Sequence, residues 1–310
     1  MTSNTPSQPQ TANGRPSAGN FAQRHPVAAF LVLALGIGWV SLGIPLLAGI
    51  PMAPFLLMLT YVGLLGSALL VTRLADGPGA VRKLLSRVLI WRFGLARWAV
   101  ILFGMPVLTL AIAAVSGTLH SPKDGWLAMI GLYLFNTLIF GGLIIQLWEE
   151  TAWAGFVQSR LTARHGLLMA SLLTAVPFSL IHIPLYLEGR PTWREIGLGL
   201  LILFAAAPIY RYLLGLHLLD TGGSILAVGI QHASWNAAQK LEAVEGGAWS
   251  WQVLVAVVML TAAVAMGRRM WRSDRHPYGP LAEKAEATRW VAAPSTRGVP
   301  EAVPTRGSAT

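Results

Sequence analysis

Residues 26–72 read PVAAFLVLALGIGWVSLGIPLLAGIPMAPFLLMLTYVGLLGSALLVT and contain no charged side chain. A bilayer core about 30 Å thick is crossed by about 20 helical residues, so this run is long enough for two membrane spans. Pro45, Gly49, Pro51 and Pro54 interrupt it near its middle, where the chain has to reverse between two helices. The stretch therefore predicts two transmembrane helices joined by a short turn.

Further stretches free of Lys, Arg, Asp and Glu follow at residues 98–119, 125–148, 166–187, 196–210, 221–239 and 246–267. Together with the first two they predict an all-α, polytopic transmembrane helical bundle of about eight spans. The stretch at 196–210 is short, so it forms either a half-helix or a span that continues to Leu219 with Arg211 snorkelling to the membrane surface. We interpret it as a span.

The composition of the 310-residue chain agrees with a membrane protein. Apolar residues make up 54% of it and charged residues only 12%, and the mean hydropathy is +0.57. These values exclude a soluble enzyme and a disordered chain. The absence of cysteine excludes disulfides, thiolate nucleophiles and Cys-based metal sites, so any chemistry has to come from Glu, Asp, His, Ser and amide side chains.

The basic residues determine the expected orientation, because Lys and Arg near span ends favour the cytoplasmic side. With eight spans and a cytoplasmic N-terminus, only Lys123, Arg190, Arg194 and Lys240 fall near span ends on the opposite side. We therefore expect a multi-pass protein of the cell membrane with both termini in the cytoplasm. The net charge of +10 follows mostly from this topology, and no pattern typical of nucleic-acid binding accompanies it.

Both ends of the chain are poor in apolar residues and predict disordered tails. The expected organisation is a cytoplasmic tail at 1–25, a transmembrane helical domain at 26–268, and a cytoplasmic tail at 269–310 that is first basic and then disordered. Neither tail carries a pattern that indicates an enzyme.

Polar residues form three clusters at positions where the bilayer disfavours them, since burying an ionisable group there costs at least about 2.5 kcal/mol. Glu149 and Glu150 end an apolar run, His182 lies deep in an apolar span, and His232 and Asn236 lie one helical turn apart. Such groups can form a site in which a carboxylate takes a proton from water while the His and Asn side chains stabilise an oxyanion. They can equally hold a divalent metal such as zinc with an open position for water.

Each cluster alone also has a purely structural explanation. Glu149 and Glu150 suit the solvated end of a span, and Asn236 suits a hydrogen bond between helices. His182 suits a hydrogen bond to a backbone carbonyl freed by Pro184. Only their occurrence together favours a functional site.

The depths of two clusters conflict if the fourth predicted helix ends at Trp148. Glu149 would then lie at the membrane surface, whereas His182 lies about 24 Å along its own helix from Gly166. The two groups can meet if the fourth helix instead continues to Leu161 and carries the glutamates into the membrane.

Three ordered motifs within residues 126–239 resemble those of the CPBP family (CAAX proteases and bacteriocin-processing enzymes, also called Abi), to which the type II CAAX prenyl proteases belong. The motifs are Glu149-Glu150, Phe178-x-x-x-His182 and His232-x-x-x-Asn236. The resemblance implies an intramembrane endopeptidase whose partners are the lipid bilayer and a membrane-associated peptide or protein substrate.

The catalytic residues that the resemblance implies are Glu149, Glu150, His182, His232 and Asn236, with Phe178 in support. Glu149 would be the general base that activates water. Family members have been described both as metal-independent glutamate proteases and as metalloproteases. In a metal-dependent enzyme, Glu149, His182 and His232 would be the ligands of a divalent cation such as zinc.

The chain departs from the family's first motif at one position. The family usually carries Arg four residues after the second Glu, where this chain has Ala154. The missing charge leaves the glutamates less stabilised, which keeps open a family member that binds a peptide without cutting it. A proton-coupled transporter, which also buries Glu and His, is the remaining alternative.

Overall fold

The computed structural model describes residues 18–189, 191–244, 287–289 and 291 of the chain. In these residues the protein consists of helices and connecting loops and contains no β-strand, and an isolated bridge joins Leu119 to Val244. The predicted all-α class is confirmed.

Six helices in the described part of the chain are long and apolar enough to cross a membrane, which indicates a multi-pass membrane protein. Three of them are single helices: α2 (Pro26–Ala48), α6 (Leu95–Ser116) and α11 (Trp193–Asp220). The second long helix consists of α3 (Ala53–Met58), η1 (Leu59–Gly66) and α4 (Ser67–Asp76), and the fifth consists of α10 (Leu167–His182) and η5 (Ile183–Leu187). The fourth consists of α7 (Trp126–Phe135), η3 (Asn136–Gln146), α8 (Leu147–Glu150), η4 (Thr151–Gln158) and α9 (Ser159–His165). They correspond to the first six predicted spans.

The remaining predicted spans differ in outcome. The stretch at 221–239 forms α12 (Ile225–Ala238), which is shorter than the about 20 residues that cross a bilayer. The stretch at 246–267 lies outside the described residues.

Three shorter helices complete the described chain: α1 (Ala18–Arg24), α5 (Pro78–Ser86) and η2 (Arg87–Leu89). The prediction of a disordered tail over residues 1–25 is wrong for α1. This helix is ordered because Ala22 is buried in the same apolar cluster as Phe30 and Val71, so it packs against α2 and α4. Nearly all of the predicted tail at 269–310 lies outside the described residues.

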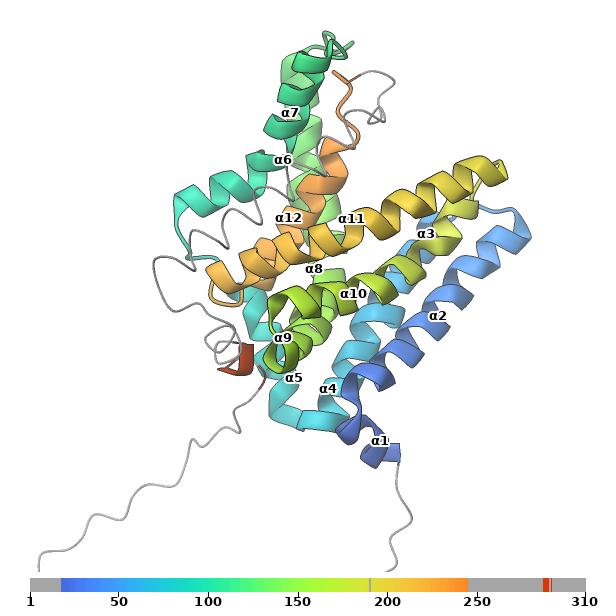
Figure 1. Ribbon diagram of the computed structural model, residues 1–310, viewed down its shortest axis with the longest axis vertical. Coiled ribbons are helices and arrows are strands. Elements are labelled where there is room, and N and C mark those ends of the chain that lie inside the picture. Colours follow the sequence, from blue (N-terminus) through green and yellow to red (C-terminus); the bar gives the residue numbers. More distant parts are fainter. Residues whose placement is uncertain (1–17, 190, 245–286, 290, 292–310) are drawn as a thin grey trace, which may run out of the picture.

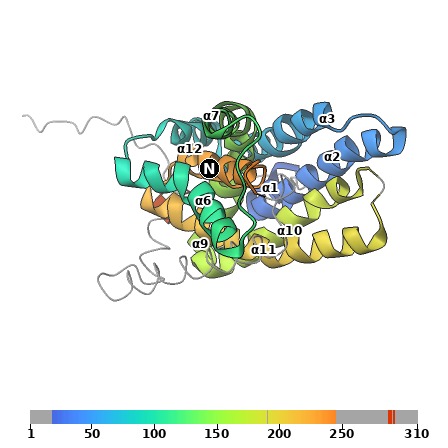
Figure 2. The same ribbon diagram turned by 90° about the horizontal axis from the view of Figure 1, so that it is seen from above.

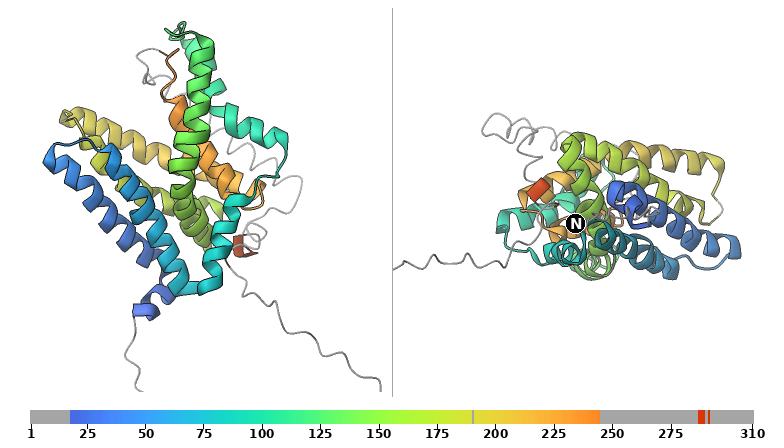
Figure 3. Two further views of the ribbon diagram at one scale, coloured as in Figure 1. Left: turned by 180° about the vertical axis from the view of Figure 1, so that it is seen from behind. Right: turned by 90° about the horizontal axis from the view of Figure 1, so that it is seen from below.

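The bundle has two ends, which are clearest for α2, α10 and α11 because these helices run obliquely across Figure 1. The segment at residues 77–94, which contains α5 and η2, and the loops at 166 and 221–224 lie at one end, which we call the α5 end. The loops at 49–52 and 117–125, residues 188–189 and 191–192, and the C-terminus of α12 lie at the other end, which we call the α3 end (Figures 1 and 3).

The helices that contribute to the site pack around α12. This helix lies against η3, α6, α8 and α11, while α10 packs along α11 (Figure 2). Gly229 permits the contact with α8, because a Cβ atom there would lie only 2.8 Å from Cα of Leu147. The missing side chain therefore allows α12 to approach the backbone that carries the two glutamates.

The fourth long helix does not end at Trp148 but continues to His165, as the alternative with a longer helix required. Within it, the π-helical segments η3 and η4 lie directly before and after α8, which contains Glu149 and Glu150. π-Helical turns are rare and are frequently found at functional sites. The glutamates therefore lie inside the bundle, and the conflict of depth with His182 disappears.

Arg87 holds η4 to the start of α12 at the α5 end. Its guanidinium donates hydrogen bonds to the carbonyl of Gly223 (2.9 Å), the carbonyl of Gly155 (3.0 Å) and Oγ of Ser159 (3.2 Å). Burial, aided by the nearby charge of Arg160, lowers the pKa of Arg87 to about 9, so the side chain stays protonated at neutral pH. The arginine thus fixes the turn that follows the glutamates.

Candidate functional site

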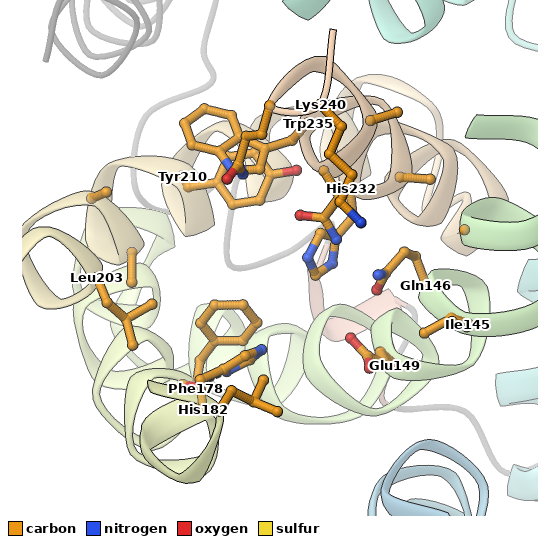
Figure 4. A pocket seen from close by; sticks show the side chains of 18 of the residues that line it. Ile145, Gln146, Glu149, Phe178, His182, Leu203, Tyr210, His232, Trp235 and Lys240 are labelled. Carbon is orange, nitrogen blue, oxygen red and sulfur yellow. Dashed lines mark hydrogen bonds between the residues drawn. The ribbon is translucent and has the colours of Figure 1, made fainter. Parts of the chain in front are cut away.

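A cavity of about 660 Å³ lies between η3, α8, α10, α11 and α12, with a contribution from α3. Five of the six residues that the sequence selected line it: Glu149, Phe178, His182, His232 and Asn236 (Figure 4). The segments that carry them are far apart in the chain, so their convergence is a property of the tertiary fold. Glu150 is the exception, since it does not line the cavity and its side chain is completely buried.

Glu150 is the centre of a buried polar network behind the cavity. Its Oε1 lies 2.7 Å from Nη1 of Arg211 and 2.9 Å from Nδ1 of His232, and its Oε2 lies 3.0 Å from the same Nη1. Nη2 of Arg211 donates to Oε1 of Gln158 at 2.8 Å. Because a carboxylate only accepts, Nδ1 of His232 carries the proton of the shared hydrogen bond. The network therefore holds the His232 ring in one orientation.

Arg211 corrects two expectations from the sequence. It does not snorkel to the membrane surface, because its side chain is completely buried and paired with Glu150. It also supplies a positive charge to the glutamate pair from α11, although the motif position in η4 is occupied by Ala154. Ala154 lies in the same buried apolar cluster as Tyr210 and Leu214, the neighbours of Arg211 on α11. The loss of the motif arginine therefore does not leave the glutamates without a cationic partner.

Glu149 has a different environment from Glu150. It lines the cavity, is 8% exposed, and accepts a hydrogen bond of 3.1 Å from Oγ1 of Thr60 in η1. Thr60 was not selected from the sequence, although its position in the long uncharged run was the one available signal. The two adjacent carboxylates thus have separate positions, with one at the cavity surface and one behind it.

His182 lies across the cavity from α12. Its Nδ1 is 2.6 Å from the carbonyl oxygen of Phe178, so this nitrogen donates and Nε2 is left with its lone pair. The Phe178 ring lies between the two histidines, with ring centroids 4.5 Å from His182 and 6.0 Å from His232. Trp153 supports this ring in an edge-on contact at 5.7 Å. Phe178 is therefore well placed to hold both imidazoles at the cavity wall.

Six further polar residues line the cavity and were missed from the sequence: Asn136, Gln146, Tyr186, Tyr210, Gln239 and Lys240. Tyr210 donates to the carbonyl of Gln231 at 3.2 Å and stacks edge-on against His232. Oε1 of Gln146 is buried and has no hydrogen-bond partner among the described residues. Gln146 lies one helical turn before Glu149, a spacing that gives both side chains a common face. This spacing was the signal that could have found it.

The described residues contain no group of three or more His, Asp or Glu side chains that could hold a metal ion together. The expected metal ligands Glu149, His182 and His232 line one cavity but do not form such a group. The residues present thus do not fit a divalent cation held by these three side chains, and we derive no step through one.

Comparison with known families agrees with the motifs. Residues 132–238 match the family model described as type II CAAX prenyl endopeptidase Rce1-like, which confirms the resemblance for this part of the chain. At the level of the family, the match supports an intramembrane protease of the CAAX type. No curated protein matches the chain significantly.

Proposed function

We propose that this chain, which carries an Rce1-like domain at residues 132–238, is an endopeptidase that cleaves peptide bonds within the membrane with a water activated by Glu149. The observation that carries the proposal is a single cavity lined by Glu149, His182, His232 and Asn236, with Glu150 buried behind it. A carboxylate can activate water as a general base, and imidazole and amide groups can stabilise the oxyanion, so these side chains together can hydrolyse an amide without a thiol or hydroxyl nucleophile.

In the proposed mechanism, water lies between Glu149 and His182. The lone pair on Nε2 of His182 accepts one hydrogen of the water, because Nδ1 is committed to the carbonyl of Phe178. Glu149 removes the other proton as the oxygen attacks the carbonyl carbon of the substrate. When the C–N bond of the tetrahedral intermediate breaks, the proton on Glu149 passes to the leaving nitrogen, so the enzyme returns to its starting state.

The oxyanion that forms during the attack needs hydrogen-bond donors. Asn236 supplies its amide, and His232 supplies Nε2–H when its ring is doubly protonated. The Glu150 carboxylate accepts the 2.9 Å hydrogen bond from Nδ1 and thereby fixes the orientation of the ring. Arg211 in turn balances the charge of Glu150, so one network orients and polarises the donor on His232.

Three properties favour catalysis over binding alone. The reason to consider a non-catalytic member was the missing arginine at Ala154, and Arg211 supplies that charge. Glu149 lines the cavity, where a substrate can reach it. The apolar side chains around it exclude bulk water and strengthen its electrostatic interactions.

The test is cleavage of an internally quenched apolar peptide by the purified protein in detergent. Glu149→Gln is expected to lower kcat by about 10²–10⁴-fold, the contribution typical of a general base. Glu188→Gln is the matched control, because Glu188 is an exposed loop carboxylate that does not line the cavity. Retention of full activity by Glu149→Gln would contradict the mechanism. Peptide binding by the native protein without turnover would favour a non-catalytic binder, and peptide-independent, pH-driven flux in vesicles would favour a transporter.

A further inference from the structure

The two ends of the bundle differ strongly in charge. At the α5 end, the segment from the end of α4 to the start of α6 contains Arg73, Arg82, Lys83, Arg87, Arg92 and Arg97. Arg24 at the end of α1 and Arg160 and Arg164 in α9 lie at the same end. The described acidic residues at this end are Asp76, which is paired with Arg160, and Asp220 at the end of α11, so this end has a large excess of positive charge.

The α3 end has no such excess. Its described basic residues are Lys123, Arg194 and Lys240, and acidic residues accompany them at Asp124, Glu188, Glu195 and Glu242. Because Lys and Arg are concentrated on the cytoplasmic side of membrane proteins, the charges assign the α5 end to the cytoplasm and the α3 end to the opposite side.

The cavity is formed by the halves of the helices that are nearer the α3 end. On α10 and η5 it is lined by residues from Phe178 to Tyr186, and on α11 by residues from Gly199 to Tyr210. On α12 it is lined from His232 onward, and the exposed side chain of Lys240 belongs to its rim just beyond the end of this helix. Figure 4 shows Lys240 above His232 on the same side of the cavity.

The floor of the cavity is closed towards the α5 end. Glu150 and Arg211 are completely buried beneath Glu149 and His232, and Gln158 is bonded to Arg211. Trp153 and Phe156 fill the space towards α2 and are also completely buried. In the described part of the chain, therefore, the glutamates are reached from the α3 end of the bundle and not from the end that carries the positive charge.

We infer that the site receives its substrate from the non-cytoplasmic side of the membrane, as an apolar segment of an exported or membrane-anchored polypeptide. The inference rests on the proposed function and names the class of substrate for the same site. The apolar walls around Phe178, Leu203 and Tyr210 accommodate apolar side chains, and Lys240 attracts an acidic group of the segment at the rim. A polypeptide tail confined to the cytoplasm does not reach this cavity.

The access side can be tested by labelling, because the chain has no native cysteine. Two single-cysteine variants, Lys123→Cys and Lys240→Cys, report on the α3 end, and Arg82→Cys and Arg92→Cys report on the α5 end. All four replaced side chains are exposed. The probe is a membrane-impermeant maleimide applied to bacterial spheroplasts and to inverted membrane vesicles.

Lys123→Cys and Lys240→Cys are expected to react at least ten times faster in spheroplasts than in inverted vesicles. Arg82→Cys and Arg92→Cys are expected to react at least ten times faster in inverted vesicles than in spheroplasts. The reverse pattern, or reaction of all four variants from one side, would overturn the inference. This measurement does not depend on enzymatic activity, so it remains informative if the proposed function is wrong.

A second experiment links access to turnover. The protein is reconstituted in liposomes, the fraction of each orientation is measured by labelling Lys123→Cys and Arg92→Cys, and a quenched apolar peptide with a hydrophilic tag is added outside. Cleavage is expected to rise in proportion to the fraction with Lys123→Cys facing outwards. Cleavage that instead rises with the fraction in which Arg92→Cys faces outwards would contradict the inference but not the proposed function. The absence of cleavage even in detergent would contradict the proposed function itself.

Discussion

Replacement of Arg211 by methionine removes the positive charge from a completely buried network while retaining most of the volume of the side chain. Glu150 then keeps only the hydrogen bond to His232, and Oε1 of Gln158 loses its donor. Removing one partner of a buried ion pair typically costs about 3–5 kcal/mol, because the other charge stays buried without compensation. Since proteins are stable by only about 5–15 kcal/mol, Arg211→Met is expected to lower the thermal midpoint markedly and reduce cleavage.

The structure suggests a rescue that distinguishes the charge from general packing. Ala154 lies in the apolar cluster that flanks Arg211, and position 154 is where related motifs carry their arginine. The double variant Arg211→Met with Ala154→Arg is therefore expected to recover part of the lost activity, whereas Ala154→Met in the same background is not. Arg211→Lys retains the charge but cannot contact Glu150 and Gln158 with separate nitrogens as the guanidinium does, so its activity is expected to be intermediate.

Cleavage rates and thermal unfolding of these variants, both measured in detergent, distinguish the role of the charge from that of packing. A double-mutant cycle with Glu150→Gln gives the coupling energy between the two side chains. Wild-type stability and activity in Arg211→Met, or a coupling energy near zero, would refute the role assigned to the pair.

The other expectations concern the cavity itself. Gly229→Ala pushes α12 away from Leu147 and is expected to lower the cleavage rate by about 10²-fold, because displacements near 1 Å can reduce a rate by that factor. Gly36→Ala is the control and should change the cleavage rate little, because nothing lies within 4 Å of its added Cβ. Asn236→Ala removes an oxyanion donor and is expected to lower kcat by about 10²–10³-fold, so an unchanged kcat would exclude that role. Gln146→Leu removes an amide whose oxygen has no partner among the described residues and is expected to raise KM while kcat changes less, as steady-state kinetics with the quenched peptide will show. Treatment with 1,10-phenanthroline is expected to leave the rate unchanged, and loss of activity that zinc restores would contradict the proposed metal-free route.

Local patterns in the sequence were sufficient to predict the class of fold. Five runs without charges, the first of them long enough for two spans, became six long helices, because an uncharged stretch of this length has to satisfy its backbone hydrogen bonds internally in a bilayer. The four-residue spacings of Phe178 with His182 and of His232 with Asn236 were equally local, and these residues line one cavity. Motif order and helical periodicity could therefore identify most of the candidate site.

The span ends that the sequence left open lie at charged groups. Glu149 and Glu150 were the reason for ending the fourth span at Trp148, and Arg211 was the reason for doubting the sixth. In the structure both helices continue past these charges, because Arg211 and Glu150 pair with each other across 61 positions of sequence. A hydropathy pattern places the end of a span at each charged residue, because it contains no information on a neutralising partner that is distant in the chain.

The sequence by itself thus determined that the chain forms apolar helices and which of them carry acidic, imidazole and amide groups, because both properties depend on neighbours within a few residues. Only the tertiary structure decided that Arg211 pairs with Glu150 and that Thr60 contacts Glu149. The close approach of α12 at Gly229 and the set of helices that line the cavity were decided in the same way. These features depend on which helix faces meet, and the packing of side chains from several helices selects that arrangement.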